Sequence, residues 1–316
     1  MITGIGWVKG GVAKSPRLIA VMGPTGSGKS DLAESLADRF DAVLVNADAF
    51  QVYRGFDIGT NTPENAGRYE LIDICDPEEQ FGVGEWLRLV VPILERAWGN
   101  QQDVIVVGGT GLYVRALFEG YSEMSGAPDP ALREELMRRE REEGIGALVA
   151  ELRKLDADRA DRVDLNNAVR VRRALEKILG GGESISVEIP PFLKLKYGLE
   201  VDRELHRILL GERLIAMVDR GWIEEVRRLR EGGISESSPA MRAIGYHTWT
   251  KYLSGATTFD EAMAEVLTLT VQYAKRQRTW MRKEPGLVVF DIDPTSGELR
   301  NRVLAMICSS ISNLSG

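Results

Sequence analysis

The segment GPTGSGKS at residues 23–30 matches the pattern G-x-x-x-x-G-K-[ST] of loops that bind phosphate groups. In such a loop the backbone N–H groups and the N-terminus of the following helix surround a di- or triphosphate. The Lys29 ammonium neutralises this ligand, and the Ser30 hydroxyl can bind Mg²⁺. The pattern therefore predicts a polyphosphate ligand with magnesium, without saying which polyphosphate it is.

A second group able to do chemistry is the carboxylate of Asp48, which ends the apolar run DAVLVNAD. A plain nucleotide hydrolase usually holds its metal with an acid at a strand end, and Asp48 is the acid available there. Three roles remain open: outer-sphere metal ligand, general base toward an acceptor, or cap of the segment that follows. The neighbours Gln51, Tyr53 and Arg54 favour a binding role, because they supply hydrogen-bonding and stacking groups suited to a planar heterocycle.

The elements that position these residues form a repeated strand-and-helix pattern. Three apolar runs are typical of buried strands: RLIAVMG at 17–23, DAVLVNAD at 41–48 and DVIVVGG at 103–109. After the run at 17–23 the apolar residues have helical spacing, and after the run at 103–109 a helix is expected to start near Thr110. The carboxyl ends of such strands bind ligands in open α/β sheets, so Lys29, Asp48 and Thr110 are expected to converge there.

The rest of the chain predicts an added helical part. Residues 121–186 lack β-type runs and are rich in Arg, Glu, Leu and Ala, which predicts several short polar helices. After Pro190-Pro191 we expect a strand at 192–201, two long helices over 202–233 and 259–283, and a final strand at 287–293. The expected fold is an α/β, P-loop NTPase-like core with a parallel sheet flanked by helices, plus an inserted all-helical domain.

The expected domain boundaries follow these patterns. We expect a flexible N-terminal lead at 1–16, a core formed by 17–120 and 187–316, and the inserted domain at 121–186.

Composition limits the function classes. The net charge of −7 argues against wholesale coating by nucleic acid but leaves room for a local basic groove. No apolar run reaches the roughly 20 residues of a membrane span. Cys75 and Cys308 are expected to be reduced thiols. These features predict a cytoplasmic protein without a membrane partner, and nothing in the helices marks a symmetric interface, so a monomer is expected.

Five motifs together resemble one family, the tRNA dimethylallyltransferases (tRNA isopentenyltransferases). They are GPTGSGKS, NADAFQVYRGFDIGTNTP, VVGGTGLYVRALFEG, AIGYHTWTKYLSG and AKRQRTWMR, in this order. The resemblance covers about residues 17–285. It implies transfer of a dimethylallyl group from dimethylallyl diphosphate to N6 of adenosine 37, next to the anticodon of a tRNA. Diphosphate would leave, and the inserted helices would clamp the anticodon stem-loop.

The resemblance also implies roles for individual residues. Asp48, Thr110 and Arg213 correspond to the family's catalytic base, channel-mouth threonine and diphosphate-binding arginine. The diphosphate would lie on Gly23, Pro24, Thr25, Gly26, Ser27, Gly28, Lys29 and Ser30. The tRNA would contact Asp48, Ala49, Phe50, Gln51, Thr110, Arg133, Arg170, Arg173, Arg242, Lys275, Arg276 and Arg278. The adenosine would be extruded from its stack to reach the channel.

Some positions depart from the family's pattern. Ala49 replaces a small hydroxyl residue, and Leu209 stands where the family often has a basic residue. Asp164, Asn167 and Val169 replace an HxND-like segment and a glutamine. These departures bear on tRNA affinity more than on the transfer chemistry.

Three other functions compete with the main expectation. An adenylate isopentenyltransferase would use free AMP, although a free nucleotide needs no helical clamp. A P-loop small-molecule kinase would consume ATP, and a non-catalytic RNA-binding protein would leave the phosphate loop unexplained. His206 and His247 have no acid or cysteine at metal-ligand spacing, so they are interpreted as solvated or packing histidines.

Overall fold

The computed structural model describes residues 15–120, 130–180, 189 and 191–313, and the chain divides into two compact units. Unit 1 comprises Met1–Glu119 and Ile189–Gly316, and unit 2 comprises Gly120–Glu188. Almost all of the expected N-terminal lead lies outside the described residues. Among the described helices, none is both long and apolar enough to cross a membrane.

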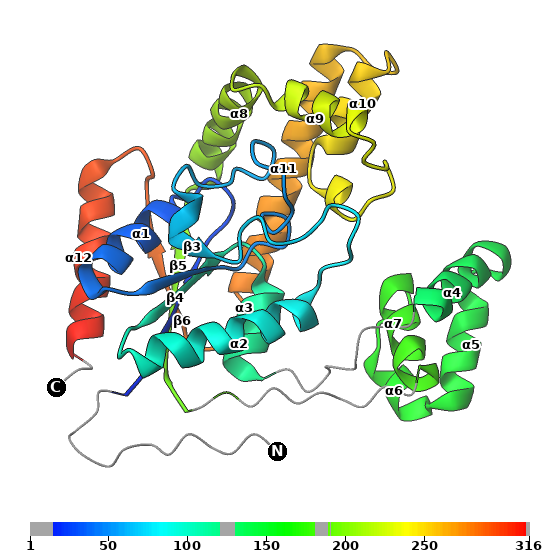
Figure 1. The fold of residues 1–316 in the computed structure, drawn as a ribbon, viewed down its shortest axis with the longest axis horizontal. Coiled ribbons are helices and arrows are strands. Elements are labelled where there is room, and N and C mark those ends of the chain that lie inside the picture. The colour runs from blue at the N-terminus through cyan, green and yellow to red at the C-terminus, as the bar shows by residue number, and fades with distance from the viewer. Residues whose placement is uncertain (1–14, 121–129, 181–188, 190, 314–316) are drawn as a thin grey trace. The chain divides into compact units, whose positions relative to one another are not determined.

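Unit 1 is built on a six-stranded parallel sheet with strand order β3-β2-β4-β1-β5-β6 (Figure 1). The strands are β1 Arg17–Met22, β2 Val43–Asn46, β3 Tyr69–Glu70, β4 Val104–Gly108, β5 Leu193–Glu200 and β6 Leu287–Asp291. The central strands β1 and β4 are buried along their whole length, as expected when helices cover both faces of a parallel sheet. The α/β class with a parallel sheet is confirmed.

Helices flank this sheet on both faces, as Figure 1 shows. Helix α1 (Lys29–Phe40) packs beside α12 (Gly297–Asn313), and α2 (Val83–Gly99) packs beside α3 (Gly111–Glu119). The core under α1 and α12 joins sheet residues such as Ile19 and Ile105 to Leu36, Ile307 and Ile311. Because the strands are parallel, β1 to β4 all end at the same edge of this packed sheet. The phosphate loop follows β1 at that edge.

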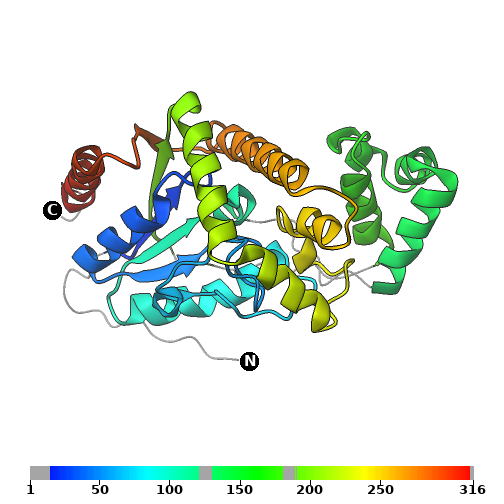
Figure 2. The same ribbon diagram turned by 90° about the horizontal axis from the view of Figure 1, so that it is seen from above.

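A second helical layer of unit 1 comes from the C-terminal half of the chain. It contains α8 (Arg203–Asp219), α9 (Trp222–Glu231), α10 (Tyr246–Leu253) and α11 (Phe259–Met281), and α8 packs against α11 (Figure 2). Trp222, Tyr246 and Trp249 are fully or almost fully buried in its core, together with Val52 and Phe56 of the segment after β2. This helical layer therefore packs against the segment that begins with Asp48.

Unit 2 is entirely helical over its described residues. It contains α4 (Pro130–Glu143), α5 (Ile145–Leu155), α6 (Ala157–Arg162) and α7 (Ala168–Leu179). Its own core is formed mainly by fully buried leucine and valine side chains, which include Leu136, Leu148, Leu152, Val171 and Leu175. The helical character expected for this part of the chain is confirmed.

The fold differs from the sequence-based expectation in its helix boundaries and in three additional elements, while the cysteines agree with it. The prediction of a single long helix over 202–233 is wrong. Gly221 adopts a left-handed conformation with φ 98°, and it separates α8 from α9. Strand β3 and helices α2 and α12 were not expected. Cys75 and Cys308 are both free and buried.

Candidate functional site

The phosphate loop lies between β1 and α1 in the strand-loop-helix context that its motif requires. Gly26 and Gly28 have φ values of 78° and 79°, a conformation that side chains rarely adopt. A Cβ atom on Gly23 would lie 2.3 Å from Ser27 Oγ, so a side chain there would displace this buried hydroxyl. Helix α1 begins at Lys29 without a side-chain cap, and its first N–H groups therefore remain for a bound anion.

Two cations face the loop cavity from different elements. Lys29 comes from α1 and Arg213 from α8, and both line a cavity of about 300 Å³. Burial, together with the nearby charge of Arg213, lowers the pKa of Lys29 to about 8, while Asp48 acts to raise it. Burial likewise lowers the pKa of Arg213 to about 10, with a further contribution from Arg220. Concentrated positive charge without enough local counter-charge is expected of a site that binds an anion.

This charge pattern predicts that diphosphate binding weakens above about pH 8. The free protein loses the Lys29 charge as the pH rises through its lowered pKa, whereas a bound diphosphate favours the charged form. Binding therefore takes up a proton at higher pH, and affinity falls by up to about tenfold per pH unit. Titration calorimetry with inorganic diphosphate at pH 7 and pH 9 measures this change.

The control for this prediction is Lys29→Arg, because a guanidinium stays charged at both pH values. The affinity of this variant for diphosphate should change less between pH 7 and pH 9 than that of the unmodified protein. The change that remains reports titration of the diphosphate itself. Equal pH dependence in the two proteins would contradict the assigned role of Lys29.

The carboxylate of Asp48 is held in place by local hydrogen bonds just after β2. Asn46, which is buried, accepts a hydrogen bond from Asp48 N–H at 2.9 Å and donates to the carbonyl of Leu71 at 3.0 Å. Asp48 Oδ1 accepts from Phe50 N–H at 3.0 Å. Capping, one of the three roles that the sequence left open, is thus present, and it occupies one oxygen only. Oδ2 makes no hydrogen bond to another described residue, so it is available to a bound molecule.

Thr110 lies beside Asp48 at the end of β4. Its Oγ1 accepts a hydrogen bond from Ala49 N–H at 3.0 Å, and its own N–H donates to the carbonyl of Ala47 at 3.1 Å. A Cβ on Gly108 would lie 2.2 Å from that carbonyl oxygen, which explains why the strand ends in glycine. The structure therefore brings Lys29, Asp48 and Thr110 to one edge of the sheet.

Asp48 stands where two cavities meet. The 300 Å³ cavity contains the phosphate loop, and a second cavity of about 290 Å³ is lined by apolar side chains such as Leu214, Met217 and Trp222. Four residues line both cavities: Thr25, Asp48, Thr60 and Arg213. A molecule with an anionic end and an apolar end could occupy both cavities, and its junction would lie beside the carboxylate.

The residues around the second cavity include several that were expected to contact RNA. Phe50, Arg242 and Arg276 line it, and Arg276 lies over the ring of Tyr273, 5.6 Å from the ring centroid. Gln51 lines the phosphate cavity and donates to the carbonyls of Thr60 and Asn61. The departure Leu209 lines that cavity as well.

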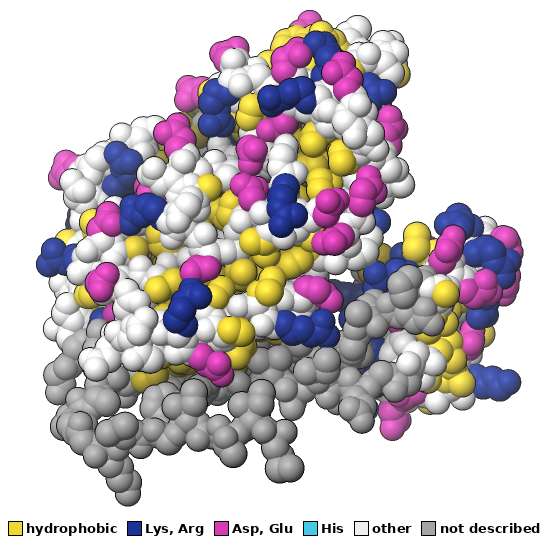
Figure 3. All heavy atoms as spheres, in the orientation of Figure 1, with side chains coloured by type: hydrophobic (Ala, Val, Ile, Leu, Met, Phe, Trp, Pro, Cys, Tyr) yellow, Lys and Arg dark blue, Asp and Glu magenta, His cyan; other side chains and the backbone are white. Residues whose placement is uncertain are grey.

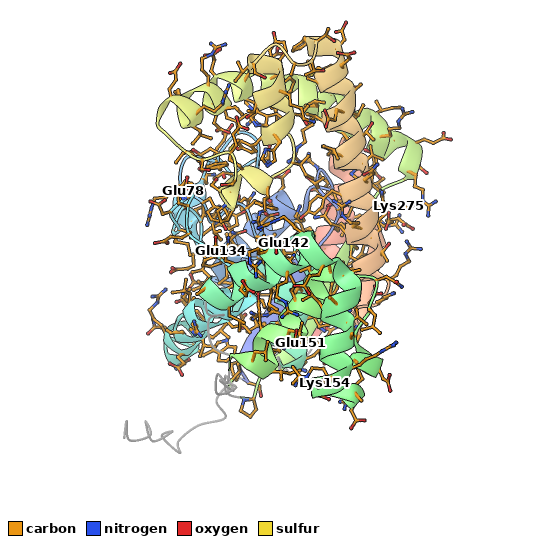
Figure 4. The ribbon with its side chains drawn as sticks, turned by 90° about the vertical axis from the view of Figure 1, so that its right-hand side faces the viewer. Glu78, Glu134, Glu142, Glu151, Lys154 and Lys275 are labelled. Carbon is orange, nitrogen blue, oxygen red and sulfur yellow. The ribbon has the colours of Figure 1, made fainter. Side chains whose placement is uncertain are left out.

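Lys275 and Arg278 of α11 face different surroundings. Lys275 is exposed to solvent (Figure 4). Arg278 is mostly buried, pairs with Glu200, and donates to the carbonyl of Val201. Among the expected RNA contacts, Arg278 is thus already engaged within unit 1.

Two of the three arginines expected to bind RNA in unit 2 contact one buried carboxylate. Arg133 of α4 and Arg173 of α7 both donate to Glu176. Burial acts to raise the pKa of Glu176, but these hydrogen bonds outweigh it and hold the pKa below its usual value. Arg170 is exposed, and Asn167 caps α7 by accepting from Arg170 N–H. Of these three arginines, Arg170 is the most accessible to a partner.

Surface charges of both signs are interspersed over the face in Figure 3, rather than forming one positive field. This agrees with the net charge of −7. Within the described residues, no cluster of three or more His, Cys, Asp or Glu side chains could hold a metal ion. A bound magnesium would therefore depend on the Ser30 hydroxyl, water and the oxygens of a phosphate ligand, an arrangement common for Mg²⁺.

Two residues that touch the phosphate loop were not expected from the sequence. His206 of α8 is buried, with Nε2 2.8 Å from the carbonyl oxygen of Thr25. Gln277 of α11 is also buried and accepts from Thr25 N–H at 2.8 Å. Helical spacing could have shown that both side chains face inward, but not which loop they contact.

Comparisons with known proteins agree on one family. A family model described as IPP transferase matches residues 51–284. A tRNA dimethylallyltransferase of Geobacter sulfurreducens is 39% identical over 282 residues, which is 86% of this chain and 90% of that protein. One of Natranaerobius thermophilus is 33% identical over 308 residues, 94% of this chain and 93% of its own.

One solved structure gives the same family, and a second shares the fold. The crystal structure of a full-length tRNA isopentenylpyrophosphate transferase from Bacillus halodurans has a TM-score of 0.70 to this chain at 32% identity. The match covers 95% of this chain and 98% of that protein. A eukaryotic dimethylallyltransferase shares the fold with a TM-score of 0.78 at 23% identity.

Proposed function

Because the chain belongs to the IPP transferase family, we propose that it transfers the dimethylallyl group of dimethylallyl diphosphate to N6 of adenosine 37 in tRNA. The products are N6-(dimethylallyl)adenosine and diphosphate. The observation that carries this proposal is the position of Asp48, which lines both the phosphate cavity and the apolar cavity next to it. An allylic diphosphate has an anionic and an apolar end, and its reacting carbon joins the two.

The residues of the site fit the steps of this reaction. The exocyclic amine of adenine is a weak nucleophile and must lose a proton as it attacks the allylic carbon. The Asp48 carboxylate can accept that proton through Oδ2, while Phe50 N–H fixes Oδ1. As the carbon–oxygen bond breaks, charge develops on the diphosphate, and loop N–H groups, Lys29 and Arg213 stabilise it.

Magnesium fits this site as a partner of the diphosphate. Ser30 opens α1 within the phosphate cavity and offers a hydroxyl ligand. When bound, Mg²⁺ would neutralise part of the charge that develops on the leaving group. The chain would supply few of its ligands, so metal affinity should depend strongly on bound diphosphate.

The proposed RNA partner is the anticodon stem-loop of a tRNA, with the target base entering the cavity that Phe50, Arg242 and Arg276 line. The inserted domain, expected at 121–186, would clamp the stem through exposed cations such as Arg170. A monomer acting in the cytoplasm is sufficient for this reaction.

The test is incubation with radiolabelled dimethylallyl diphosphate, Mg²⁺ and two acceptors side by side. One acceptor is an anticodon stem-loop RNA with A36-A37-A38, and the other is free AMP. Label in the RNA alone is the expected result. Label in AMP would assign an adenylate isopentenyltransferase instead, and ATP consumption without label in either acceptor would assign a kinase.

A further inference from the structure

Gln277 joins the phosphate loop to the segment that carries Thr110. Its side chain is 4% exposed and extends from α11 between two strand ends. The amide oxygen accepts a hydrogen bond from Thr25 N–H at 2.8 Å, and the amide nitrogen donates to the carbonyl of Gly109 at 3.2 Å. One side chain thus uses both ends of its amide to connect the loops after β1 and β4.

The contact with Gly109 is close enough to fix the residue type there. A Cβ atom at this position would lie 1.8 Å from Gln277 Nε2. Only glycine therefore allows the bridge, and this gives the second glycine of the VVGG run a function that its backbone conformation does not require.

His206 holds the other side of the same loop residue. Its Nδ1 lies 2.8 Å from the Arg278 guanidinium, which can only donate, so Nδ1 accepts and Nε2 carries the proton. Nε2–H then donates to the carbonyl of Thr25 at 2.8 Å. Glu200 pairs with Arg278 and fixes it in turn. The N–H and the carbonyl of Thr25 are therefore both hydrogen-bonded to side chains, from α11 and α8 respectively.

The bridge continues to the carboxylate. Gly109 precedes Thr110, whose Oγ1 accepts from Ala49 N–H, the group directly after Asp48. Hydrogen bonds, joined by the peptide bond between Gly109 and Thr110, thus link Thr25, which lines both cavities, to the backbone beside Asp48. A shift of the loop relative to β4 would stretch this series at Gln277.

We propose that Gln277 is a positioning residue that sets the distance between the diphosphate loop and the Asp48–Thr110 segment, and that His206 fixes the loop from the opposite side. The proposal rests on the proposed function, because it concerns the geometry between the leaving group and the attacking amine. Displacement at carbon requires near-attack alignment, and a misplacement of about 1 Å can cost about a hundredfold in rate.

The test is a double-mutant cycle in kcat with Gln277→Leu and Thr110→Ala. Gln277→Leu is expected to lower kcat by about thirtyfold to a hundredfold, with the Kd for inorganic diphosphate and the KM for stem-loop RNA changed less than threefold. The double variant should be much less impaired than the product of the two single effects, because both act through one linked series.

Two results would overturn the proposal. Multiplicative effects in the cycle would show that Gln277 acts independently of Thr110, as a packing residue does. A raised KM for RNA with unchanged kcat would make Gln277 an RNA-binding residue. An inactive wild-type protein would instead contradict the proposed function, so the two failures can be told apart.

Controls separate positioning from folding. Gln272→Leu makes the same substitution at an exposed position of α11 and should keep the wild-type melting temperature. His206→Gln, which retains a side-chain N–H donor, should keep more of kcat than His206→Leu. Equal losses in these two His206 variants, with equal falls in melting temperature, would remove His206 from the proposal.

Discussion

Replacing Asp48 with asparagine is expected to lower kcat for prenyl transfer about a thousandfold. The asparagine side chain can keep the hydrogen bond from Phe50 N–H through its amide oxygen, but it cannot accept the proton that the adenine amine loses. The Kd for inorganic diphosphate should stay within about threefold, because Lys29, Arg213 and the loop amides supply the anion site. Single-turnover kinetics with stem-loop RNA and isothermal titration with diphosphate measure the two quantities separately.

Asp41→Asn is the matched control for this prediction. Asp41 is exposed at the other end of β2 and has φ 50°, a conformation that asparagine tolerates well. Its kcat should equal that of the unmodified protein. If Asp48→Asn lost diphosphate binding in the presence of Mg²⁺ as strongly as it lost kcat, the carboxylate would be a metal ligand rather than the base.

Replacing Arg213 with glutamine should reduce kcat/KM for dimethylallyl diphosphate by about 10²- to 10³-fold. The guanidinium faces the phosphate cavity, where developing charge on a leaving group is stabilised most strongly. Arg213 also lowers the pKa of Lys29, so its removal should raise that pKa above about 8. The pH at which diphosphate affinity begins to fall should therefore move upward in the variant.

Arg207→Gln tests whether any loss of charge on α8 has this effect. Arg207 is exposed on the same helix, so kcat/KM should change little. Equal losses in the two variants would indicate a general electrostatic effect on RNA or donor association. An unchanged pH profile in Arg213→Gln would contradict the coupling between Arg213 and Lys29.

The parts of the site that the sequence predicted are those fixed by local pattern. A glycine-rich loop between an apolar strand and a helix has one common geometry, and parallel strands end at one edge of their sheet. Lys29, Asp48 and Thr110 could therefore be placed together from these patterns alone. The apolar runs also located β1, β2, β4, β5 and β6 to within a few residues.

The missed features depend on contacts between distant residues. His206 and Gln277 lie on amphipathic helices, and periodicity shows only that they face inward. Their contact with Thr25 arises from the packing of α8 and α11 over the loop, at sequence separations of 181 and 252. Strand β3 has only two residues, too few for a pattern, and Gly221 ends α8 through its backbone conformation alone.

The two separate cores have a consequence for measuring stability. Five of the six tryptophans, at positions 86, 98, 222, 249 and 280, lie in the described part of unit 1, and the sequence of unit 2 contains none. Tryptophan fluorescence therefore follows the melting of the α/β unit and does not report on the helical one, whereas far-ultraviolet circular dichroism detects both. The two signals should give denaturation curves that do not coincide, so a free energy of unfolding obtained from fluorescence alone describes only part of the chain.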